Sequence, residues 1–345
     1  MSSSGYKPVS LDGAEQVYLE VGSGNAEFGS GNRKTEFDLE RFGSISDNCQ
    51  QYLSVVIFEP LAQNLARQDM VKLLNDKSAL VNHIIHELHE RSDREPIYSS
   101  DAVDPFAAAG VLLLLSHKSC NNKGPAQPCL ILNKRSLKVR QPGDLCCPGG
   151  SVAPLVDPYF ARFLSLPFVS LGRWQYWRQW KKNQSPVARL LALFWATGLR
   201  ESFEEMRLNP FGVRFLGPLP PQPLVMFQRT IYPLVAWIDR QKRFFPNWEV
   251  EKVVDIPLRD LLNPANYARY RLCLNPAGDS ESVNSMRHYP CFRFQLSNDT
   301  ELLWGATYRI VTVFLNYIFG FEPPDHKEIP IIEGSLDQNY LTGQR

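Results

Sequence analysis

The chain has 345 residues, of which 44% are hydrophobic and 21% charged, and its formal net charge at pH 7 is +1. This composition is ordinary for a globular protein, and the length suffices for one large domain or two modest ones. The near-zero net charge argues against nucleic acid or an acidic macromolecule as the partner, unless a local basic patch attracts it.

The seven cysteines follow no spacing that indicates a disulfide framework or a zinc site. Their number is odd, no C-x-x-C pair occurs, and the adjacent Cys146 and Cys147 have poor geometry for bridging each other. We therefore expect a reducing compartment. The segment from Met1 to Gln16 lacks the apolar stretch of a signal peptide, and the longest apolar runs are about half of a membrane span. These features predict a soluble, cytoplasmic protein.

The N-terminal part of the chain changes in composition along its length. Residues 1–50 are rich in Ser, Gly and Asn without apolar periodicity, which is typical of a flexible segment. Residues 51–105 are predicted to form a helical extension, because apolar residues recur at helical spacing from Pro60 to about Arg91.

Short apolar runs and amphipathic stretches follow from residue 106 to about residue 320. Two of these runs, 107–115 and 128–132, flank a polar turn and predict a β-hairpin. Strands and helices then mix without regular βαβ alternation, which favours an α+β fold with a mixed sheet. Periodicity ends after about Phe321, so residues 321–345 are expected to be a tail. The other predicted strands are 213–216, 230–238, 250–256 and 291–296, and the predicted helices are 190–208, 258–262 and 304–319.

The most informative of these helices reads R-E-S-F-E-E from Arg200 to Glu205. Residues three and four apart share a helix face, so Glu201 lines up with Glu204 and Glu205. Three carboxylates on one turn repel each other and raise one another's pKa unless a cation compensates them. Mg²⁺ or Mn²⁺ prefers such oxygen ligands. The alternative is a solvated acidic face paired with Arg200 and Arg207.

A glycine loop upstream of this helix adds to the pattern. Residues 143–150 read G-D-L-C-C-P-G-G, whose glycines let the backbone approach a metal or a phosphate closely. Together with R-E-S-F-E-E, this loop resembles the box of the Nudix hydrolases. The resemblance implies a Nudix-type α/β/α sandwich in which Mg²⁺ or Mn²⁺ is bound and Arg200 orients the glutamates. The implied metal ligands are Glu201, Glu204, Glu205 and the carbonyl of Gly149.

The box departs from the family pattern in three places. An aromatic-rich insertion at about 156–190 splits it between Gly150 and Arg200. The first glutamate of the family box has no counterpart, since counting back eight residues from Arg200 gives Ala192. Arg207 replaces the last glycine, which leaves the C-terminal cap of the helix in question.

Three further stretches are similar to the coenzyme A diphosphatase branch of that family. They are 130–140 with the glycine loop, 247–258 and 303–307, and they follow the order of the branch's motifs. The resemblance implies a Nudix hydrolase domain over 106–320. Glu249 is then a further metal ligand or the general base, and the alternative is a plain strand-edge carboxylate. The implied catalytic residues are Glu201, Glu204, Arg200 and Glu249, and the implied substrate-binding residues are Arg135, Ser136, Arg140 and Gly150.

The insertion is basic and aromatic, with no acid between Pro158 and Arg200. Such a stretch can form a helical hairpin with buried aromatic side chains. It can also form a lid or a homodimer surface, or a peripheral membrane contact through 159–182. The sequence leaves these alternatives open.

The expected activity is the metal-dependent hydrolysis of a small-molecule diphosphate, in which water attacks a nucleoside diphosphate linked to another moiety. Coenzyme A or a derivative is the preferred substrate, and ADP-ribose or a dinucleotide is the alternative. A non-catalytic Nudix-fold module that binds a nucleotide or a membrane is the alternative from another class, because the box lacks its first glutamate and its last glycine.

Overall fold

The computed structural model divides into two compact units, Met1–Glu59 and Pro60–Arg345. All residues that the structure describes belong to the second unit, and the predictions for 1–50 and 51–68 lie outside them. The described residues are 69–94, 98, 107–119, 124–224, 229–274, 286–296, 299–325, 329–336 and 340.

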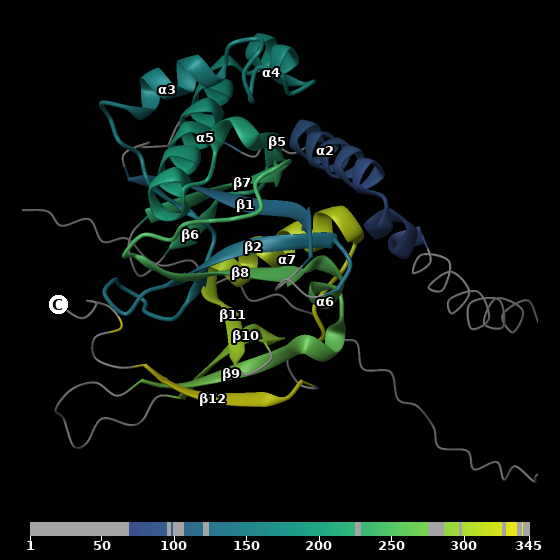
Figure 1. Cartoon of the computed structure of the whole chain (residues 1–345), viewed down its shortest axis with the longest axis vertical. Helices are drawn as coiled ribbons and strands as arrows, with labels where there is room; N and C mark the ends of the chain where they lie inside the picture. The colour runs from purple at the N-terminus through teal and green to yellow at the C-terminus, as the bar shows by residue number, and fades with distance from the viewer. Residues whose placement is uncertain are drawn as a thin grey trace, which may run out of the picture. The chain divides into compact units, whose positions relative to one another are not determined.

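A mixed sheet of eight strands forms the centre of the second unit (Figure 1). Its strands are β1 (Ala108–Lys118), β2 (Gln127–Arg135), β3 (Leu145–Cys146), β4 (Gly149–Ser151), β5 (Val213–Pro218), β6 (Gln222–Leu224), β7 (Arg229–Ile238) and β8 (Val250–Pro257). The order is β3-β2-β1-β7-β5, while β4 pairs with β1, β6 with β7 and β8 with β2. The predicted hairpin is confirmed as the antiparallel pair β1–β2, and β1 runs parallel to β7.

The burial of β1 explains its uninterrupted apolar sequence. The four leucines from Leu112 to Leu115 are all fully buried, so both faces of the strand are covered. A strand of this kind reads as a continuous apolar run instead of an alternating one.

A second sheet of four strands contains most of what the sequence pattern missed. It comprises β9 (Tyr267–Leu274), β10 (Met286–Gln295), β11 (Thr300–Trp304) and β12 (Ile331–Leu336), in the order β11-β10-β9-β12. Only β10 was predicted in part. β12 lies in the segment predicted to be a tail, and it pairs parallel with β9. Its six residues, I-I-E-G-S-L, become a strand through pairing with a distant partner, which local periodicity does not reveal.

The predicted helices are present, which makes the fold α+β as expected. The long ones are α2 (Lys77–Arg94), α5 (Ser185–Met206) and α7 (Gly305–Phe319), and the short ones are α6 (Leu258–Leu261) and the 3₁₀ turns Pro210–Gly212 and Pro264–Asn266. α5 packs on β1 and β4, whereas α7 contacts β6, β10, β11 and α2. Figure 1 shows α5 above the large sheet and α7 at its rear.

One glycine in β1 lets α5 approach the sheet closely. A Cβ atom at Gly110 would lie 2.5 Å from the backbone carbonyl oxygen of Phe194, so any other residue would push the helix away. This contact fixes the depth at which α5 sits over the sheet.

The insertion is helical, and its aromatic residues fall into two groups. It contains α3 (Asp157–Leu164) and α4 (Trp177–Asn183), which lie at the top of the view in Figure 1 and pack on α5. Trp174, Trp177 and Trp180 are each 5% exposed, as a packed hairpin predicts. Tyr159 and Phe168 are exposed, so packing within the described residues accounts for only part of the aromatic content.

One of the described cysteines is not a free thiol. Cys129 on β2 is disulfide-bonded, which the scattered spacing of the cysteines did not indicate. Cys146, Cys147 and Cys291 are free. Over the described ranges, no helix is both long enough and apolar enough to cross a membrane.

Candidate active site

The carboxylate helix ends immediately after its acidic residues. Arg207 follows Met206 with a left-handed backbone, φ 56° and ψ 40°. Its N–H donates to the carbonyl of Phe203 at 3.0 Å, and the N–H of Leu208 donates to that of Ser202 at 3.3 Å. The C-terminal cap in question is therefore present, although an arginine occupies the conformation that usually requires glycine.

Glu205 is the most perturbed of the three glutamates. Its Oε2 atom accepts hydrogen bonds from Nδ2 of the buried Asn133 on β2 at 3.0 Å and from the N–H of Gly149 at 3.3 Å. Burial, together with the nearby carboxylates of Glu201 and Glu249, raises the pKa of Glu205 to about 8 against the opposing effects of the Gly149 N–H and the charge of Arg135. Glu205 therefore holds a proton at neutral pH unless a cation replaces it.

Glu201 lies directly against the glycine loop. A Cβ atom at Gly150 would lie 2.6 Å from the carboxyl carbon of Glu201, so only glycine leaves room for this side chain. Burial raises the pKa of Glu201, and the guanidinium of Arg200, 3.1 Å from its Oε1, opposes that shift.

Arg200 is held by an aspartate that the sequence pattern did not identify as a site residue. Its Nε and Nη2 donate to the two carboxylate oxygens of Asp157 at 2.7 and 3.1 Å. Asp157 is fully buried at the start of α3 and also accepts from Thr197 Oγ1 and from the N–H of Ala153. Counting back along the helix pointed to Ala192, which is a buried apolar residue. The sequence feature that could have identified Asp157 is its position, since it is an acid soon after Gly150 and directly before the stretch from Pro158 to Arg200 that contains no acid.

Glu204 and Glu249 complete the carboxylate set in different ways. The side chain of Glu204 is 53% exposed and lies 3.3 Å from Nη1 of Arg200. Glu249 stands just before β8, on a loop whose residue Asn247 donates its N–H to the carbonyl of Glu205. The structure thus brings Glu249 to the end of the carboxylate helix.

Of the residues predicted to bind substrate, Ser136 and Arg140 lie on the loop that joins β2 to β3, Arg135 ends β2, and Gly150 lies on β4. The positive charge of Arg135 lowers the pKa of Glu205, so its side chain is near the carboxylates, and its Nε donates to the carbonyl of Arg140 at 2.7 Å. The Ser136 hydroxyl donates to the carbonyl of Trp248 at 2.8 Å and is therefore occupied. In the described structure the guanidinium of Arg140 makes no hydrogen bond or ion pair.

A second half-buried carboxyl group, that of Asp144, lies at the end of the loop between β2 and β3. It accepts hydrogen bonds from Nε1 of Trp304, at the start of α7, and from the hydroxyl of Tyr340. Burial raises its pKa to about 6 despite these two donors. Sequence reasoning did not single out Asp144, because its partners lie far along the chain.

The carboxylate oxygens are the type of ligand that a hard divalent cation prefers. One of the carboxyl groups, that of Glu205, is half-buried beside like charges and has a raised pKa, which a cation would reverse. In the described ranges, however, no three His, Cys, Asp or Glu side chains are arranged to hold a metal ion. The donor chemistry therefore matches the cation, while the side chains do not converge on one point.

No family model and no curated protein matches this sequence. The solved structures that it resembles include Nudix proteins. A Nudix hydrolase from M. smegmatis, RenU, has a TM-score of 0.28 at 12% identity, over 45% of this chain and 72% of the other. A C. elegans Ap4A hydrolase binary complex has a TM-score of 0.28 at 12% identity, over 45% and 83%. The NUDIX domain of Shewanella oneidensis NrtR, complexed with ADP ribose, has a TM-score of 0.28 at 15% identity, over 50% and 85%. Likenesses of this size assign neither an activity nor a substrate.

The structure adds two observations at the places where the sequence departs from the Nudix pattern. Asp157, in the segment between the glycine loop and the carboxylate helix, pairs with Arg200. Arg207 has the left-handed backbone conformation at the end of α5.

Proposed function

We propose that this chain is a Nudix hydrolase that cleaves the diphosphate of a small nucleotide-containing substrate with Mg²⁺ or Mn²⁺. The observation that supports this most is the half-buried Glu205, whose pKa is raised to about 8 beside Glu201 and Glu249 next to the glycine loop. A carboxyl group in that setting gains most from a bound cation. The proposed metal ligands are Glu201, Glu204, Glu205 and the carbonyl of Gly149.

Each residue of the site has a role in this proposal. When bound, the cation would neutralise charge on the diphosphate and lower the pKa of the attacking water. Arg200, held by Asp157, positions Glu201 and Glu204 through its guanidinium. Glu249 accepts the proton of the water as general base, and Arg135 binds a phosphate oxygen.

Coenzyme A or a derivative is the substrate that we propose, on the strength of the three motif stretches in 130–140, 247–258 and 303–307. Their structural setting agrees with a shared site, since Ser136 bonds the Trp248 carbonyl and Trp304 bonds Asp144. ADP-ribose and dinucleotides are the competing substrates. Comparing kcat/KM for coenzyme A, ADP-ribose and a dinucleoside polyphosphate tests the preference, which is wrong if either competitor is turned over faster.

The activity itself is tested with coenzyme A and Mn²⁺, from which 3′,5′-ADP and 4′-phosphopantetheine should be released. Glu201→Gln and Glu205→Gln are each expected to lower kcat by about 100-fold or more, because each removes a proposed metal ligand. Glu322→Gln, an exposed acid after α7, is the matched control and should keep full activity. Full activity in both site variants contradicts the metal assignment. Substrate binding without turnover across metals and diphosphates favours a non-catalytic module.

A further inference from the structure

The insertion exposes an apolar surface along α3 and the loops beside it, named here the α3 face. Leu155 is 85% exposed, Phe168 90% and Phe211 71%. The members on and next to α3 recur every three or four residues, so they lie on one side of the helix. The α3 face consists of Leu155, Tyr159, Phe163, Leu166, Phe168 and Phe211.

The α3 face is continuous, and α3 is already packed against the rest of the unit through its opposite side. The rings of Phe163 and Phe211 are in contact, with centroids 6.2 Å apart, which joins α3 to the segment after α5. The opposite side of α3 packs on α5 and includes the buried Ala161 and Leu164. In the part of the chain that the structure describes, nothing covers the exposed side. Contiguous apolar surface of this kind marks an interaction site, whereas single exposed apolar residues do not.

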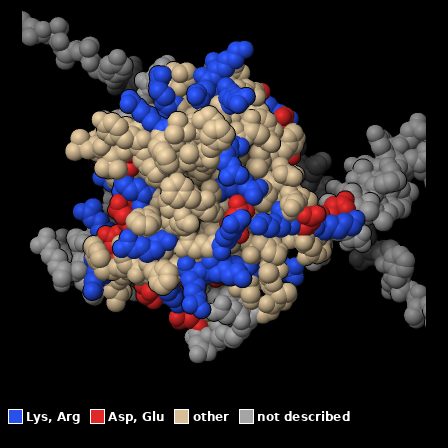
Figure 2. All heavy atoms as spheres, turned by 45° about the horizontal axis from the view of Figure 1, so that its top comes forward, with Lys and Arg blue, Asp and Glu red and all other residues tan. Residues whose placement is uncertain are grey.

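The insertion that carries most of the α3 face is rich in positive charge. The insertion and the start of α5 contain six basic residues and no acid between Pro158 and Arg200. Within the described ranges none of the six forms an ion pair, and the Arg162 guanidinium lies 5.9 Å from the centre of the Tyr159 ring. Figure 2 shows this side as a broad uncharged surface with Lys and Arg around it and fewer Asp and Glu among them. The six basic residues are Arg162, Arg173, Arg178, Lys181, Lys182 and Arg189.

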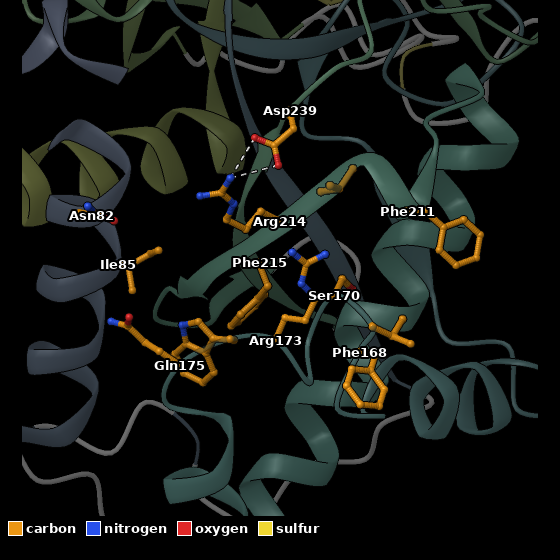
Figure 3. Close-up of a pocket in the computed structure, with 13 residues that line it drawn as sticks. Asn82, Ile85, Phe168, Ser170, Arg173, Gln175, Phe211, Arg214, Phe215 and Asp239 are labelled. Atoms are coloured by element: carbon orange, nitrogen blue, oxygen red, sulfur yellow. Dashed lines mark hydrogen bonds and ion pairs between the residues drawn. The ribbon is translucent and has the colours of Figure 1, made fainter. Parts of the chain in front are cut away.

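A cavity of about 570 Å³ opens at one end of the α3 face (Figure 3). Phe168 and Phe211 lie on one side of it, Ile85 of α2 lies on the other, and Arg173 lies between them. Trp174 also lines the cavity, and its buried Nε1 has no hydrogen-bond partner among the described residues. Asp239 lines the cavity too, and its carboxylate is paired with Arg214 at 3.1 Å. The guanidinium of Arg173 and the indole N–H of Trp174, beside aromatic rings, suit a phosphate group that carries an apolar chain.

A second copy of the chain is a poor occupant of this surface. A two-fold dimer uses the same patch on both subunits, so the six cations of each copy would face those of the other. Like charges placed opposite each other without acids between them oppose such an interface. The charge instead complements an anionic partner.

We propose that the α3 face docks on a bilayer surface that contains anionic phospholipids. Its apolar side chains would enter the interface, the six basic residues would attract the lipid phosphates, and Arg173 would take one headgroup in the cavity. Because Asp157 at the start of α3 holds Arg200, docking would place the carboxylate helix beside the membrane.

The test uses the full chain and vesicles of phosphatidylcholine with or without phosphatidylserine. We expect co-sedimentation at least ten-fold stronger with phosphatidylserine, and weaker binding as NaCl is raised. Two double variants should abolish vesicle binding and keep the circular dichroism spectrum of the wild type. One combines Phe168→Ser with Phe211→Ser, and the other combines Lys181→Glu with Lys182→Glu. The matched controls lie in the second sheet and should bind like wild type: Ile331→Ser, and Arg287→Glu with Arg293→Glu.

Three outcomes overturn the proposal, and none of them depends on enzymatic activity. The first is that the chain sediments equally with both vesicle types, or that it sediments with neither of them. The second is unchanged binding in the Phe168 and Lys181 variants. The third is a dimer in sedimentation velocity that these variants dissociate, which makes the α3 face an interface between two copies.

Discussion

Two carboxyl groups of the candidate site, Glu205 and Asp144, hold their protons more tightly than in water, and burial is the largest cause for both. Their surroundings differ. Glu205 has like charges nearby, those of Glu201 and Glu249. Asp144 has two neutral donors, Trp304 and Tyr340, and the charge of Arg135 favours its ionised form. A cation therefore benefits Glu205, whereas Trp304 and Tyr340 already donate to Asp144.

Asp144→Asn should change how stability depends on pH. The pKa of Asp144 is about 6 in the folded chain, against an ordinary value of 3.8. Between these values the unfolded chain loses the proton that the folded chain keeps, so the free energy of unfolding falls as pH rises, by roughly 1–3 kcal/mol. Asparagine does not titrate and should remove that part of the fall. Urea unfolding at pH 4.5 and 7.5 measures it, and an equal fall in both proteins contradicts the assignment.

Arg207→Gly should stabilise the chain, since a non-glycine residue at φ 56° is strained. Glycine adopts this conformation freely, and the gain should be about 0.5–1 kcal/mol. Arg207→Ala is the control, because it keeps the strain and removes the contact of the guanidinium with the Phe203 ring. Thermal or urea unfolding ranks the three proteins. If glycine and alanine are equally stable, the left-handed cap is not the cause.

Between elements, a single buried ion pair ties the insertion to the carboxylate helix. Asp157 at the start of α3 has two contacts with Arg200 on α5 and further donors in Thr197 and Ala153. The insertion therefore does more than lengthen the chain between the halves of the box. It supplies the residue that fixes Arg200, which in turn lies 3.1 Å from Glu201.

Asp157→Asn should destabilise the chain by roughly 3 kcal/mol, because it removes the one fully buried counter-charge of the Arg200 guanidinium. Glu333→Gln is the control: Glu333 is 2.7 Å from Arg271, the same separation as Asp157 from Arg200, but its side chain is 62% exposed. This exposed pair should contribute less than about 1 kcal/mol. Chemical denaturation compares them, and equal losses contradict the role of burial. Asp157→Asn should also lower the proposed hydrolase activity, because Asp157 holds Arg200 in place.

At the scale of the whole unit, the candidate site joins segments from distant parts of the chain. Asn133 comes from β2, Gly149 from β4, Glu205 from α5 and Glu249 from the loop before β8. A cation bound among them would link these segments in the folded state only. Metal binding and global stability should therefore be coupled.

Mn²⁺ should raise the Tm of the wild-type chain. A site filled at about 100 times its Kd adds roughly 2.7 kcal/mol, which corresponds to roughly 5–10 °C for a domain of this size. Glu205→Gln should lose most of this shift, and Glu322→Gln should keep it. Calorimetry with Mn²⁺ and with EDTA measures the shift. An equal shift in all three proteins places the bound metal elsewhere.

Local pattern was sufficient for elements whose own residues determine them. The apolar run of β1 and the amphipathic repeat of α5 are visible in the sequence, because covered strands and packed helices impose those periods. β12 was missed because it forms by pairing with the distant β9. β9 and β11 were also missed, although β11 pairs with β10 across a short turn. The aromatic residues of the insertion were identified as a group, but which of them are buried depends on how α3 and α4 lie on α5.

The sequence by itself determined the carboxylate helix, the glycine loop and the residue types that suit a cation, because helix periodicity places Glu201, Glu204 and Glu205 together. Only the tertiary structure decided which groups surround them. The partner of Arg200 lies across an insertion, Asn133 reaches Glu205 from another strand, and the raised pKa of Glu205 comes from burial. The cap at Arg207 rests on a backbone angle. Long-range contacts, solvent exclusion and strained dihedrals arise from the packed chain as a whole, so no local pattern of residues encodes them.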